Sequence, residues 1–381
     1  MSVELVFWIA AALVVYAYVG YPALITLAAR LRPAPAVLKG SRVPTVSLVV
    51  VVHNEEAYLA KKLRNALVLD YPRDRLEILV VSDGSTDDTE AIAASFRHEG
   101  IRLLVLPGPR GKATALNAAV LQANGEILVL TDVRQRLAPD SVGQLVAYFA
   151  DPTVGAVSGE LHLRTATDTP AAGLGMYWEY EKLIRKAESR FDSSVGVTGA
   201  FYALRRSLYP ALDPRTILDD VAIPMELVLA GHRVLFAPEA RASDLIAPSP
   251  AHEYRRKVRT LAGNYQIMAL RPVLFDPFRN RLSWQLASHK LARLAVPWCL
   301  PVLLCASAWL AAEGRAAFAV LLAAQVLFYL LAAAGGLAAR AGRSLPLASL
   351  PYAFALANLA AAHALFGFLR GTVTAAWKAS P

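Results

Sequence analysis

Four long runs of apolar residues without a charged side chain constrain this sequence more than any other feature. The first run covers residues 5–29, and three more lie at 294–312, 316–339 and 344–369. A helix of about 20 apolar residues can cross the hydrocarbon core of a bilayer. A buried helix of a soluble protein would keep a polar stripe at this length, and these runs keep none. The sequence therefore predicts about four transmembrane helices.

Charged residues beside the first run predict its orientation. The preceding segment, "MSVE", is acidic, whereas a cleaved signal peptide begins with positive charge. Positive charges follow the run at Arg30, Arg32, Lys39 and Arg42. The positive-inside rule then places residues 30–293 in the cytoplasm, at the plasma (inner) membrane.

The same rule gives two alternatives for the end of the chain. The "EGR" turn at 313–315 is charge-balanced and predicted to be external, while Arg340 and Arg343 mark an internal turn. A fourth crossing would leave residues 370–381 outside, although the positive charges of that tail argue against it. If the run 344–369 is re-entrant or interfacial, the tail lies inside instead.

Composition supports a globular domain attached to these helices. Hydrophobic residues make up 56% of the chain, yet 18% is still charged. The net charge of +9 favours a cytoplasmic face against anionic lipid over nucleic-acid binding, because no basic and aromatic sheet motif is present. Cys299 and Cys305 both fall in the second apolar run, so we expect neither a disulfide framework nor a cysteine metal site.

Residues 46–132 alternate between strand and helix patterns. A run of β-branched residues at 46–52 predicts a strand that is buried on both faces, and further strands are predicted at 76–82, 101–107 and 126–132. The helical segments between them specify a parallel sheet, and such sheets bind ligands at the carboxyl ends of their strands. No G-x-G-x-x-G motif follows the first strand, which argues against a dinucleotide site.

Three polar residues fall at these strand ends: Asn54, Asp83 and Asp132. Asn54 is placed to cap the helix that follows the first strand. Asp83 can accept hydrogen bonds from a nucleobase or ribose, and Gly84 lets the backbone approach closely. The alternative is that Asp83 and Gly84 belong to a turn whose only role is to begin the next helix. Asp132 is a candidate contact for a metal or a ribose–phosphate, with Arg134 where a second acid would be expected.

The stretch "GPRGKATALN" at 108–117 follows the third strand. Gly108 and Gly111 free the backbone, Arg110 and Lys112 supply positive charge, and a helix begins near Lys112. A helix N-terminus with cations is suited to an anion, here a diphosphate. The alternative is a solvated basic loop.

Two later stretches carry further candidates. "SVGVTGAFYALRRSLY" at 194–209 predicts a glycine-rich turn, Val197 to Ala200, before a helix. "TILDDVAIPMELVLAGHRVLFAPEA" at 216–240 places Asp219 and Asp220 at the start of a helix. These acids either cap the helix or provide a carboxylate base for an acceptor hydroxyl. Two adjacent acids raise each other's pKa, which suits a base.

Six ordered stretches resemble a known family. "VVVVHNEEAYLAKKLRNAL", "LEILVVSDGSTDDT", "GKATALN", "TDVRQRLAPD", "TGAFYALRR" and "LDDVAIPMELVLAGHRVLFAPEA", followed by "YRRKVRTLAGNYQ", are similar to family 2 inverting glycosyltransferases. The similar branch is membrane-embedded and related to hyaluronan, chitin and poly-N-acetylglucosamine synthases. The resemblance covers about residues 46–293. It implies a GT-A fold, a Rossmann-like α/β domain with a mostly parallel sheet.

The resemblance also implies roles on the donor side. Asp83 would hold the nucleoside of a nucleotide-sugar donor, and Asn54 and Glu55 would line the same site. Lys112 would lie near the donor diphosphate. Asp132 occupies the position of the first acid in the family's D-x-D motif and would bind Mg²⁺ or Mn²⁺.

On the acceptor side, Asp220 would be the general base. The residues that would contact the acceptor are Thr198, Gly199, Ala200, Asp219, Arg256 and Arg259. Two positions depart from the family pattern. Arg134 replaces the second D-x-D acid, which weakens the case for a divalent metal. Thr260 replaces the tryptophan of the Q-x-x-R-W element, which weakens the case for a processive polymerase.

The predicted organisation follows from these segments. It comprises a transmembrane helix (1–29), a linker (30–45), a cytoplasmic GT-A domain (46–270), an interfacial helical segment (271–293), a transmembrane region of about three helices (294–369) and a tail (370–381). Four helices would enclose only a narrow channel unless the chain forms an oligomer. Gln325, Asn358 and His363 are polar candidates for a sugar path in the membrane, with helix packing as the alternative.

The predicted function is an inverting transfer of a hexosyl or N-acetylhexosaminyl group from a nucleotide sugar, expected to be a UDP-sugar. The acceptor would be a polysaccharide or a lipid-linked molecule at the cytoplasmic membrane face. Three alternatives remain open: a polysaccharide synthase that extrudes its product, a non-processive enzyme that makes a glycolipid, and a non-catalytic subunit that binds nucleotide. Membrane lipid is an expected partner, and nucleic acid is not.

Overall fold

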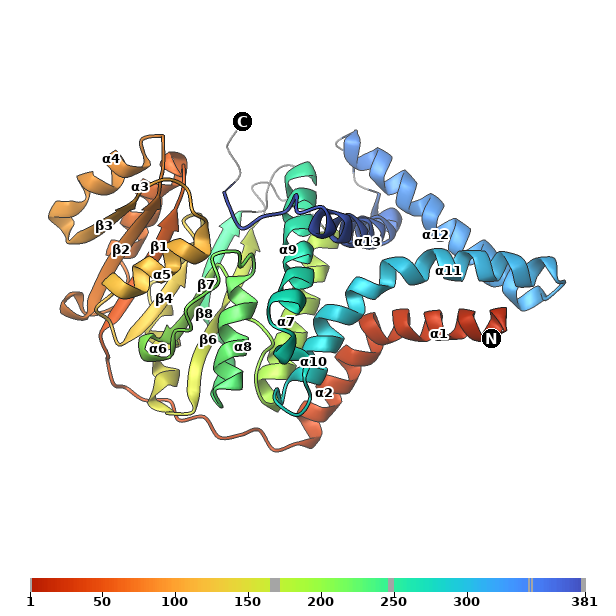
Figure 1. The fold of residues 1–381 in the computed structure, drawn as a ribbon, viewed down its shortest axis with the longest axis horizontal. Coiled ribbons are helices and arrows are strands. Elements are labelled where there is room, and N and C mark those ends of the chain that lie inside the picture. The colour runs from red at the N-terminus through yellow and green to blue at the C-terminus, as the bar shows by residue number, and fades with distance from the viewer. Residues whose placement is uncertain (1, 165–171, 246–249, 342, 344, 378–381) are drawn as a thin grey trace.

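The computed structural model describes residues 2–164, 172–245, 250–341, 343 and 345–377. A sheet domain lies on the left of Figure 1, apolar helices extend to the right, and further helices fill the space between them. Within these residues the sheet has eight strands, in the order β3-β2-β1-β4-β7-β6-β8-β5. Their bounds are β1 (Val46–Val52), β2 (Leu76–Asp83), β3 (Ile101–Leu106), β4 (Ile127–Thr131), β5 (Arg136–Leu137), β6 (Val154–Arg164), β7 (Phe201–Arg205) and β8 (Arg233–Leu245).

The first four strands confirm the predicted parallel sheet. β1 pairs in parallel with β2 on one side and with β4 on the other, and β2 pairs in parallel with β3. Each residue of β1 is buried, as expected for a strand covered on both faces. The carboxyl ends of β1, β2 and β4 therefore meet at one edge of the sheet, and Asp83 and Asp132 are brought to that edge.

The predicted helix after the turn 197–200 is wrong. Residues 201–205 form β7 instead, which pairs antiparallel with β4 and with β6 in the middle of the sheet. Phe201, Tyr202, Ala203 and Leu204 are all fully buried there. A short apolar run fits a buried strand and a buried helix equally well by periodicity, so its tertiary neighbours decide.

Helices cover both faces of the sheet. On one face, α3 (Glu56–Leu67) packs through Leu59 and Leu63 against the side chains of Leu48 and Val50. On the other face, α5 (Lys112–Gln122) packs against the alternate side chains of β1, and α8 (Asp219–Leu229) packs against β6 and β8. The smaller helices of the domain are α4 (Thr89–Ser95) and α6 (Ser141–Val146). Both faces are thus covered by helices, and the strand ends that carry Asp83 and Asp132 lie at the edge of the sheet.

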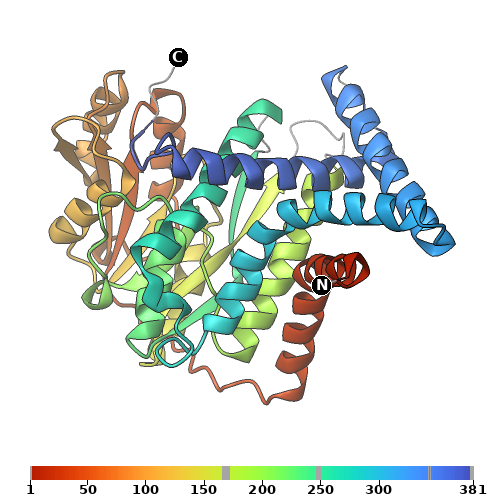
Figure 2. The same cartoon turned by 45° about the vertical axis from the view of Figure 1, so that its right-hand side comes forward.

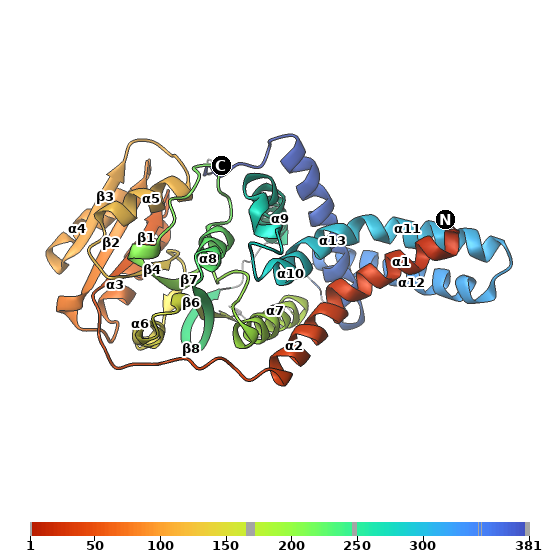
Figure 3. The same cartoon turned by 60° about the horizontal axis from the view of Figure 1, so that its bottom comes forward.

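Within the described part of the chain, four helices are long and apolar enough to cross a membrane, as predicted: Val3–Leu31, Ser283–Ala312, Ala316–Arg340 and Pro346–Leu369. The first consists of α1 (Val3–Val15), a π-turn and α2 (Tyr21–Leu31), and the second of α10 (Ser283–Leu286), a π-turn and α11 (Ala292–Ala312). The other two are α12 (Ala316–Arg340) and α13 (Pro346–Leu369). Figure 3 shows α1, α11 and α12 side by side.

The segment predicted as an interfacial helix, 271–293, is divided between two structures. Residues 272–275 form a 3₁₀ turn, and the helix that begins at Ser283 continues without interruption into α11. Phe278, between these two parts, is 98% exposed, and Trp284 is 41% exposed. Aromatic side chains are therefore presented at the junction, although no separate helix carries them.

A buried polar cluster joins the apolar helices to the sheet domain through α7 (Ala172–Phe191). The Tyr21 hydroxyl donates to Glu188, at 2.5 Å, and His289 bridges Glu188 (2.9 Å) and Glu181 (3.0 Å). These groups come from α2, α7 and the π-turn before α11. Buried charged groups that are fully paired in this way hold a single arrangement of the helices.

Helix α13 and the segment after it return toward the sheet. α13 is seen end-on in Figure 1 and lengthwise in Figure 2, whereas α11 and α12 extend away from the sheet. It packs along α9 (Pro250–Leu270). Val373, Ala375 and Trp377 then pack against the same core that contains Leu116 of α5. We call residues 370–377 the return segment; residues 378–381, including Lys378, lie outside the described residues.

Candidate functional site

Asp83 joins two loops that the sequence placed at the same edge. It is fully buried at the end of β2, and its carboxylate accepts hydrogen bonds from the backbone N–H groups of Arg110 (3.0 Å) and Gly111 (2.7 Å). Gly84 follows with a φ of 66°, and a Cβ at this position would lie 2.5 Å from the carbonyl carbon of Gly108. The 83–89 and 107–111 loops therefore form one unit.

This arrangement alters the prediction for the glycine-rich loop. The backbone N–H groups of Arg110 and Gly111, just before the helix start that was predicted to face a diphosphate, are directed at the Asp83 carboxylate. The helix does begin at Lys112, with Gly111 as its N-cap residue. Positive charge at this edge is thus provided mainly by the Lys112 side chain and the exposed Arg110.

Lys112 connects the carboxyl end of β4 to the start of α8. Its Nζ lies 3.1 Å from Oδ1 of Asp132 and 3.4 Å from Oδ2 of Asp219. Burial alone would lower the pKa of Lys112, but the negative charges of Asp132 and Asp219 outweigh it and raise the pKa above its ordinary value. Lys112 is therefore a fixed positive charge among three carboxylates.

Asp220 is the third carboxylate of this group and is half-buried in the first turn of α8. Burial, together with the charge of Asp219, raises the pKa of Asp220 to about 6, while Lys112 opposes the shift. A carboxylate of this pKa is ionised at neutral pH and is a better proton acceptor than an ordinary aspartate. The geometry is that of a base beside a fixed cation.

The turn 197–200 is packed directly against Asp220. Val197 N–H donates to the Asp220 carbonyl at 2.9 Å, and a Cβ on Gly199 would lie 3.1 Å from the Asp220 Cβ. The backbone of Thr198 is fixed by a hydrogen bond to β6, because its N–H donates to the Ser158 hydroxyl at 2.8 Å. The predicted acceptor residues Thr198, Gly199 and Ala200 therefore lie next to the predicted base.

Asn54 is near the site but does not cap the helix, so that prediction is wrong. It has a φ of 56°, its side-chain oxygen accepts from Thr86 N–H at 2.8 Å, and the N-cap residue of α3 is Glu55. Asn54 thus links the end of β1 to the loop after Asp83. Burial raises the pKa of Glu55, with Arg134 opposing and Asp132 adding to the shift.

Arg134 lies over the ring of Tyr58 on α3, with its guanidinium carbon 6.0 Å from the ring centroid. It is exposed, as is Arg136, whereas Val133, Gln135 and Leu137 between and beside them are buried. Among the described residues, no group of three or more His, Cys, Asp or Glu side chains is placed to hold a metal ion. Asp132, whose side chain is 46% exposed, offers a single carboxylate at this edge.

Helix α9 carries Arg256 and Arg259 and braces the segment before Asp219. Gln266 of α9 accepts a hydrogen bond from Ile217 N–H at 2.9 Å. Arg256 is exposed and Arg259 is half-buried on the same helix. Their contact with an acceptor stays a prediction.

Residues 47–212 match the model of the family described as "Glycosyl transferase family 2". The chain carries a family 2 glycosyltransferase domain. The matched range begins in β1 and ends after β7, and it contains Asp83, Lys112 and Asp132. It ends before Asp219 and Asp220.

Curated relatives extend the similarity beyond this range. The beta-monoglucosyldiacylglycerol synthase of Synechocystis sp. is 31% identical over 249 residues, which cover 60% of this chain and 50% of that protein. The poly-beta-1,6-N-acetyl-D-glucosamine synthase of Staphylococcus aureus is 25% identical over 231 residues, covering 58% and 55%. The chain therefore spans about half the length of these relatives.

A solved structure is similar over nearly the whole chain. It is the mannosyltransferase PcManGT from Pyrobaculum calidifontis in complex with GDP-Man and Mn²⁺, with a TM-score of 0.71 and 27% identity. The alignment covers 96% of this chain and 99% of that one. The similarity thus extends over the apolar helices of this chain as well as over its GT-A sheet.

Three residues near the site of this domain were missed from the sequence. Trp377 donates its indole N–H to Asp83, and Arg185 of α7 donates to the Thr198 hydroxyl at 2.8 Å. Lys62 of α3 donates to the Thr131 hydroxyl at 2.8 Å, and burial lowers its pKa to about 7. A lysine next to Leu63 on the apolar face of α3 was a visible signal. Trp377 had none because its partner Asp83 is distant in sequence, and Arg185 had none because it lies on α7, a helix that the sequence patterns did not reveal.

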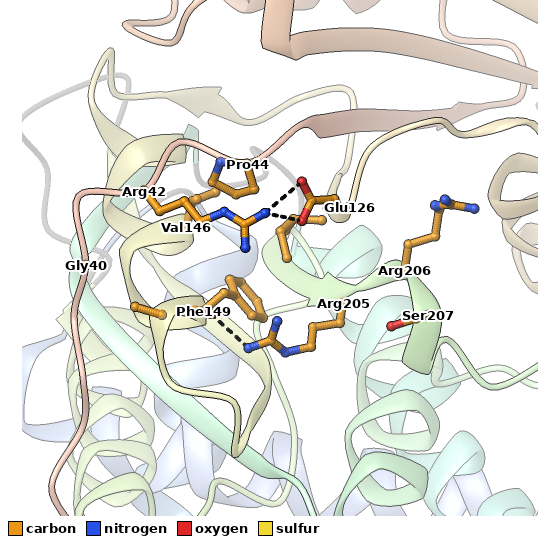
Figure 4. Close-up of a pocket in the computed structure, with 11 residues that line it drawn as sticks. Gly40, Arg42, Pro44, Glu126, Val146, Phe149, Arg205, Arg206 and Ser207 are labelled. Carbon is orange, nitrogen blue, oxygen red and sulfur yellow. Dashed lines mark hydrogen bonds and ion pairs between the residues drawn. The ribbon is translucent and has the colours of Figure 1, made fainter.

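A cavity of about 490 Å³ lies at the end of the sheet opposite to the candidate site. Figure 4 shows it between the linker before β1, the start of β4 and the end of β7. Arg42 pairs there with Glu126, and Arg205 donates to the Phe149 carbonyl. Ile127, which lines it, opens β4, whereas Asp132 follows the other end of that strand.

Proposed function

We propose that this chain transfers a sugar, with inversion, from a UDP- or GDP-sugar to a lipid-linked acceptor at the membrane surface. The observation that carries the proposal is the position of Lys112. It contacts Asp132, at the donor end of β4, and Asp219, which is next to the base Asp220. Its neighbour Gly111 contacts Asp83. The predicted donor and acceptor residues thus form one continuous set of contacts.

The reaction would follow from these positions. Asp220 would accept the proton of an acceptor hydroxyl, and the freed oxygen would attack the anomeric carbon from the face opposite the diphosphate. The bond to the diphosphate oxygen breaks, and that oxygen keeps the electron pair. Lys112 would lie beside the developing negative charge, and such stabilisation is often a large catalytic term.

Asp132 is the residue that would hold a divalent cation. Mg²⁺ often binds through one or two carboxylates, with substrate phosphates and water completing its shell, so a single exposed aspartate is compatible with it. The ion would supply further stabilisation of the leaving diphosphate. The Mn²⁺ of the similar mannosyltransferase complex supports this assignment. Arg134, directed toward Tyr58, would remain a neighbouring cation.

The apolar helices favour a lipid-linked acceptor over an extruded polysaccharide. In the most apolar stretch of each of these helices, only 11–28% is buried inside the protein. A single copy of the chain therefore leaves these helices largely open to lipid. Gln325 donates to Ser307, and Asn358 donates to the Phe354 carbonyl, which are packing contacts between or within helices. His363 contacts Tyr254 of α9. These polar side chains support helix packing rather than a sugar path.

The proposed topology has the catalytic domain in the cytoplasm, with α13 along the inner membrane surface. The return segment follows α13 and packs on the sheet domain, so the end of α13 lies on the same side as that domain. If α12 crosses the membrane back to the side of the sheet domain, both ends of α13 would lie on that side. This arrangement agrees with the interfacial alternative for the run 344–369 and places the tail inside. Exposed Phe278 and Trp284 would contact the bilayer surface.

A direct test supplies purified protein in lipid with radiolabelled UDP- and GDP-sugars, with and without Mg²⁺ or Mn²⁺. The proposal predicts a lipid-extractable product carrying one sugar, formed with only some of the donors. A ladder of long products would support the polysaccharide alternative. Nucleotide binding without any product would support the non-catalytic alternative.

A further inference from the structure

The return segment covers the residue that would hold the donor nucleoside. Trp377 donates its indole N–H to Oδ2 of Asp83 at 2.5 Å, and its ring stacks on His53 with a centroid distance of 5.6 Å and an interplanar angle of 21°. The carbonyl oxygen of Ala375 lies 2.8 Å from where a Cβ on Gly111 would be. The segment is thus packed on both loops of the predicted donor site.

The carboxylate of Asp83 has little capacity left in this state. It accepts from the N–H groups of Arg110, Gly111 and Trp377, and Asp83 is fully buried. Because Asp83 is fully buried and Trp377 donates to its Oδ2, an incoming nucleoside that uses this oxygen has to take the place of Trp377. The two backbone donors belong to the loop itself, so Trp377 is the partner that can leave.

The contacts of Trp377 match those of a nucleobase. A flat ring stacks on His53, and a ring N–H donates to a carboxylate. Uracil and guanine both carry a ring N–H, whereas adenine and cytosine carry only an exocyclic amine as donor. Uracil or guanine could therefore replace the indole and make the same two contacts: the stack on His53 and the hydrogen bond to the Asp83 carboxylate.

We propose that Trp377 is an intramolecular competitor of the donor nucleotide, and that the base it imitates is uracil or guanine. This inference rests on the proposed function, because it takes Asp83 as the nucleoside contact. While the segment is docked the donor site is closed, and the nucleotide binds the fraction of molecules in which it has moved away. The apparent dissociation constant is then the intrinsic value divided by that fraction.

The connection of the return segment to α13 gives this competition a second consequence. α13 packs along α9, and α9 contacts the segment before Asp219 through Gln266. A change at the membrane that shifts α13 would therefore act on the donor site and on the base together. Donor binding would then depend on the lipid around α13.

The test measures binding of UDP, GDP, ADP and CDP by calorimetry to the full chain in lipid nanodiscs. Trp377→Ala should tighten binding of UDP or GDP about tenfold, the equivalent of about 1.4 kcal/mol. Trp377→Phe, which keeps a ring but loses the N–H, should give a smaller gain, about threefold. Trp309→Phe is the matched control, since Trp309 is exposed on α11 and contacts Glu313. It should leave binding unchanged.

The outcomes separate this inference from the proposed function. If wild-type protein binds nucleotide and Trp377→Ala binds it no more tightly, or more weakly, Trp377 is not a competitor. Equal binding of ADP or CDP would overturn the assignment of the base. If neither wild type nor any variant binds a nucleotide, the proposed function fails and the competition fails with it. Trp377→Phe, as the conservative replacement, guards against a variant that does not fold.

Discussion

The Nζ atom of Lys112 lies 3.1 Å from Oδ1 of Asp132, which joins the N-terminus of α5 to the carboxyl end of β4. The same ammonium lies 3.4 Å from Asp219 at the start of α8. Three segments that are separate in the sequence thus meet at one positive charge. A diphosphate that binds here would find the cation already in position, which lowers the cost of organising the site during the reaction.

Replacing Lys112 tests that arrangement. Lys112→Met should lower kcat about 10²- to 10³-fold, because a positive charge beside the leaving diphosphate is lost. Steady-state kinetics with the donor identified in the panel would measure it. Lys61→Met, on the exposed side of α3, removes the same charge elsewhere and should change kcat little. Equal effects of the two substitutions would mean that Lys112 acts only through net charge.

The raised pKa of Asp220 predicts a pH dependence. Because burial and Asp219 raise this pKa to about 6, the carboxylate is protonated below that pH and cannot accept a proton. The value of kcat/KM should fall about tenfold per pH unit below the pKa. Lys112 lowers the Asp220 pKa, so residual activity of Lys112→Met should decline at higher pH than that of wild type. If activity of Lys112→Met declines at the same acidic pH as that of wild type, the group that titrates is not Asp220.

Gly199 tests the contact between the acceptor turn and the base. A Cβ there would lie 3.1–3.3 Å from Asp220 side-chain atoms, so Gly199→Ala must displace either the turn or the carboxylate. We expect about a tenfold loss of kcat, as for a small misplacement of a catalytic group, with donor affinity retained. Gly143→Ala on α6 is the control, since an added Cβ meets no atom within 4 Å. A loss of donor affinity in Gly199→Ala would contradict its placement on the acceptor side.

Gly84 tests the unit formed by the two donor loops. Gly84→Ala would place a Cβ 2.5 Å from backbone atoms of Gly108, at a φ of 66°. We expect weaker nucleotide binding and a lower melting temperature. Gly100→Ala has a similar positive φ of 84° but no atom within 4 Å, so it measures the backbone strain alone, about 1 kcal/mol. If both variants bind nucleotide equally well, the contact between the loops does not shape the donor site.

The sequence predicted the parallel half of the sheet and the residues at its edge for a clear physical reason. Strands buried on both faces must be apolar throughout, and polar residues directly after them can lie only at the edge, as Asp83 and Asp132 do. The apolar helices were equally visible, because a charge-free run of that length has few alternatives in water.

Other features depend on contacts that no local pattern reveals. β7 becomes a strand because β4 and β6 offer pairing partners on both sides. Asn54 turns away from its own helix because Thr86, on a distant loop, provides a donor for its side chain. Trp377 reaches Asp83 across most of the chain. In each case the deciding partner is remote in sequence.

The most direct test of the central claim compares wild type with Asp220→Asn in one experiment that measures both nucleotide binding and sugar transfer. If Asp220 is the base of a site whose donor side is formed by Asp83 and Lys112, Asp220→Asn should bind the donor nucleotide as wild type does. Its transfer rate should fall by about 10²- to 10⁴-fold. Asp213→Asn, at a half-buried aspartate paired with Arg215, should match wild type in both measurements. Transfer by Asp220→Asn at the wild-type rate would contradict the account.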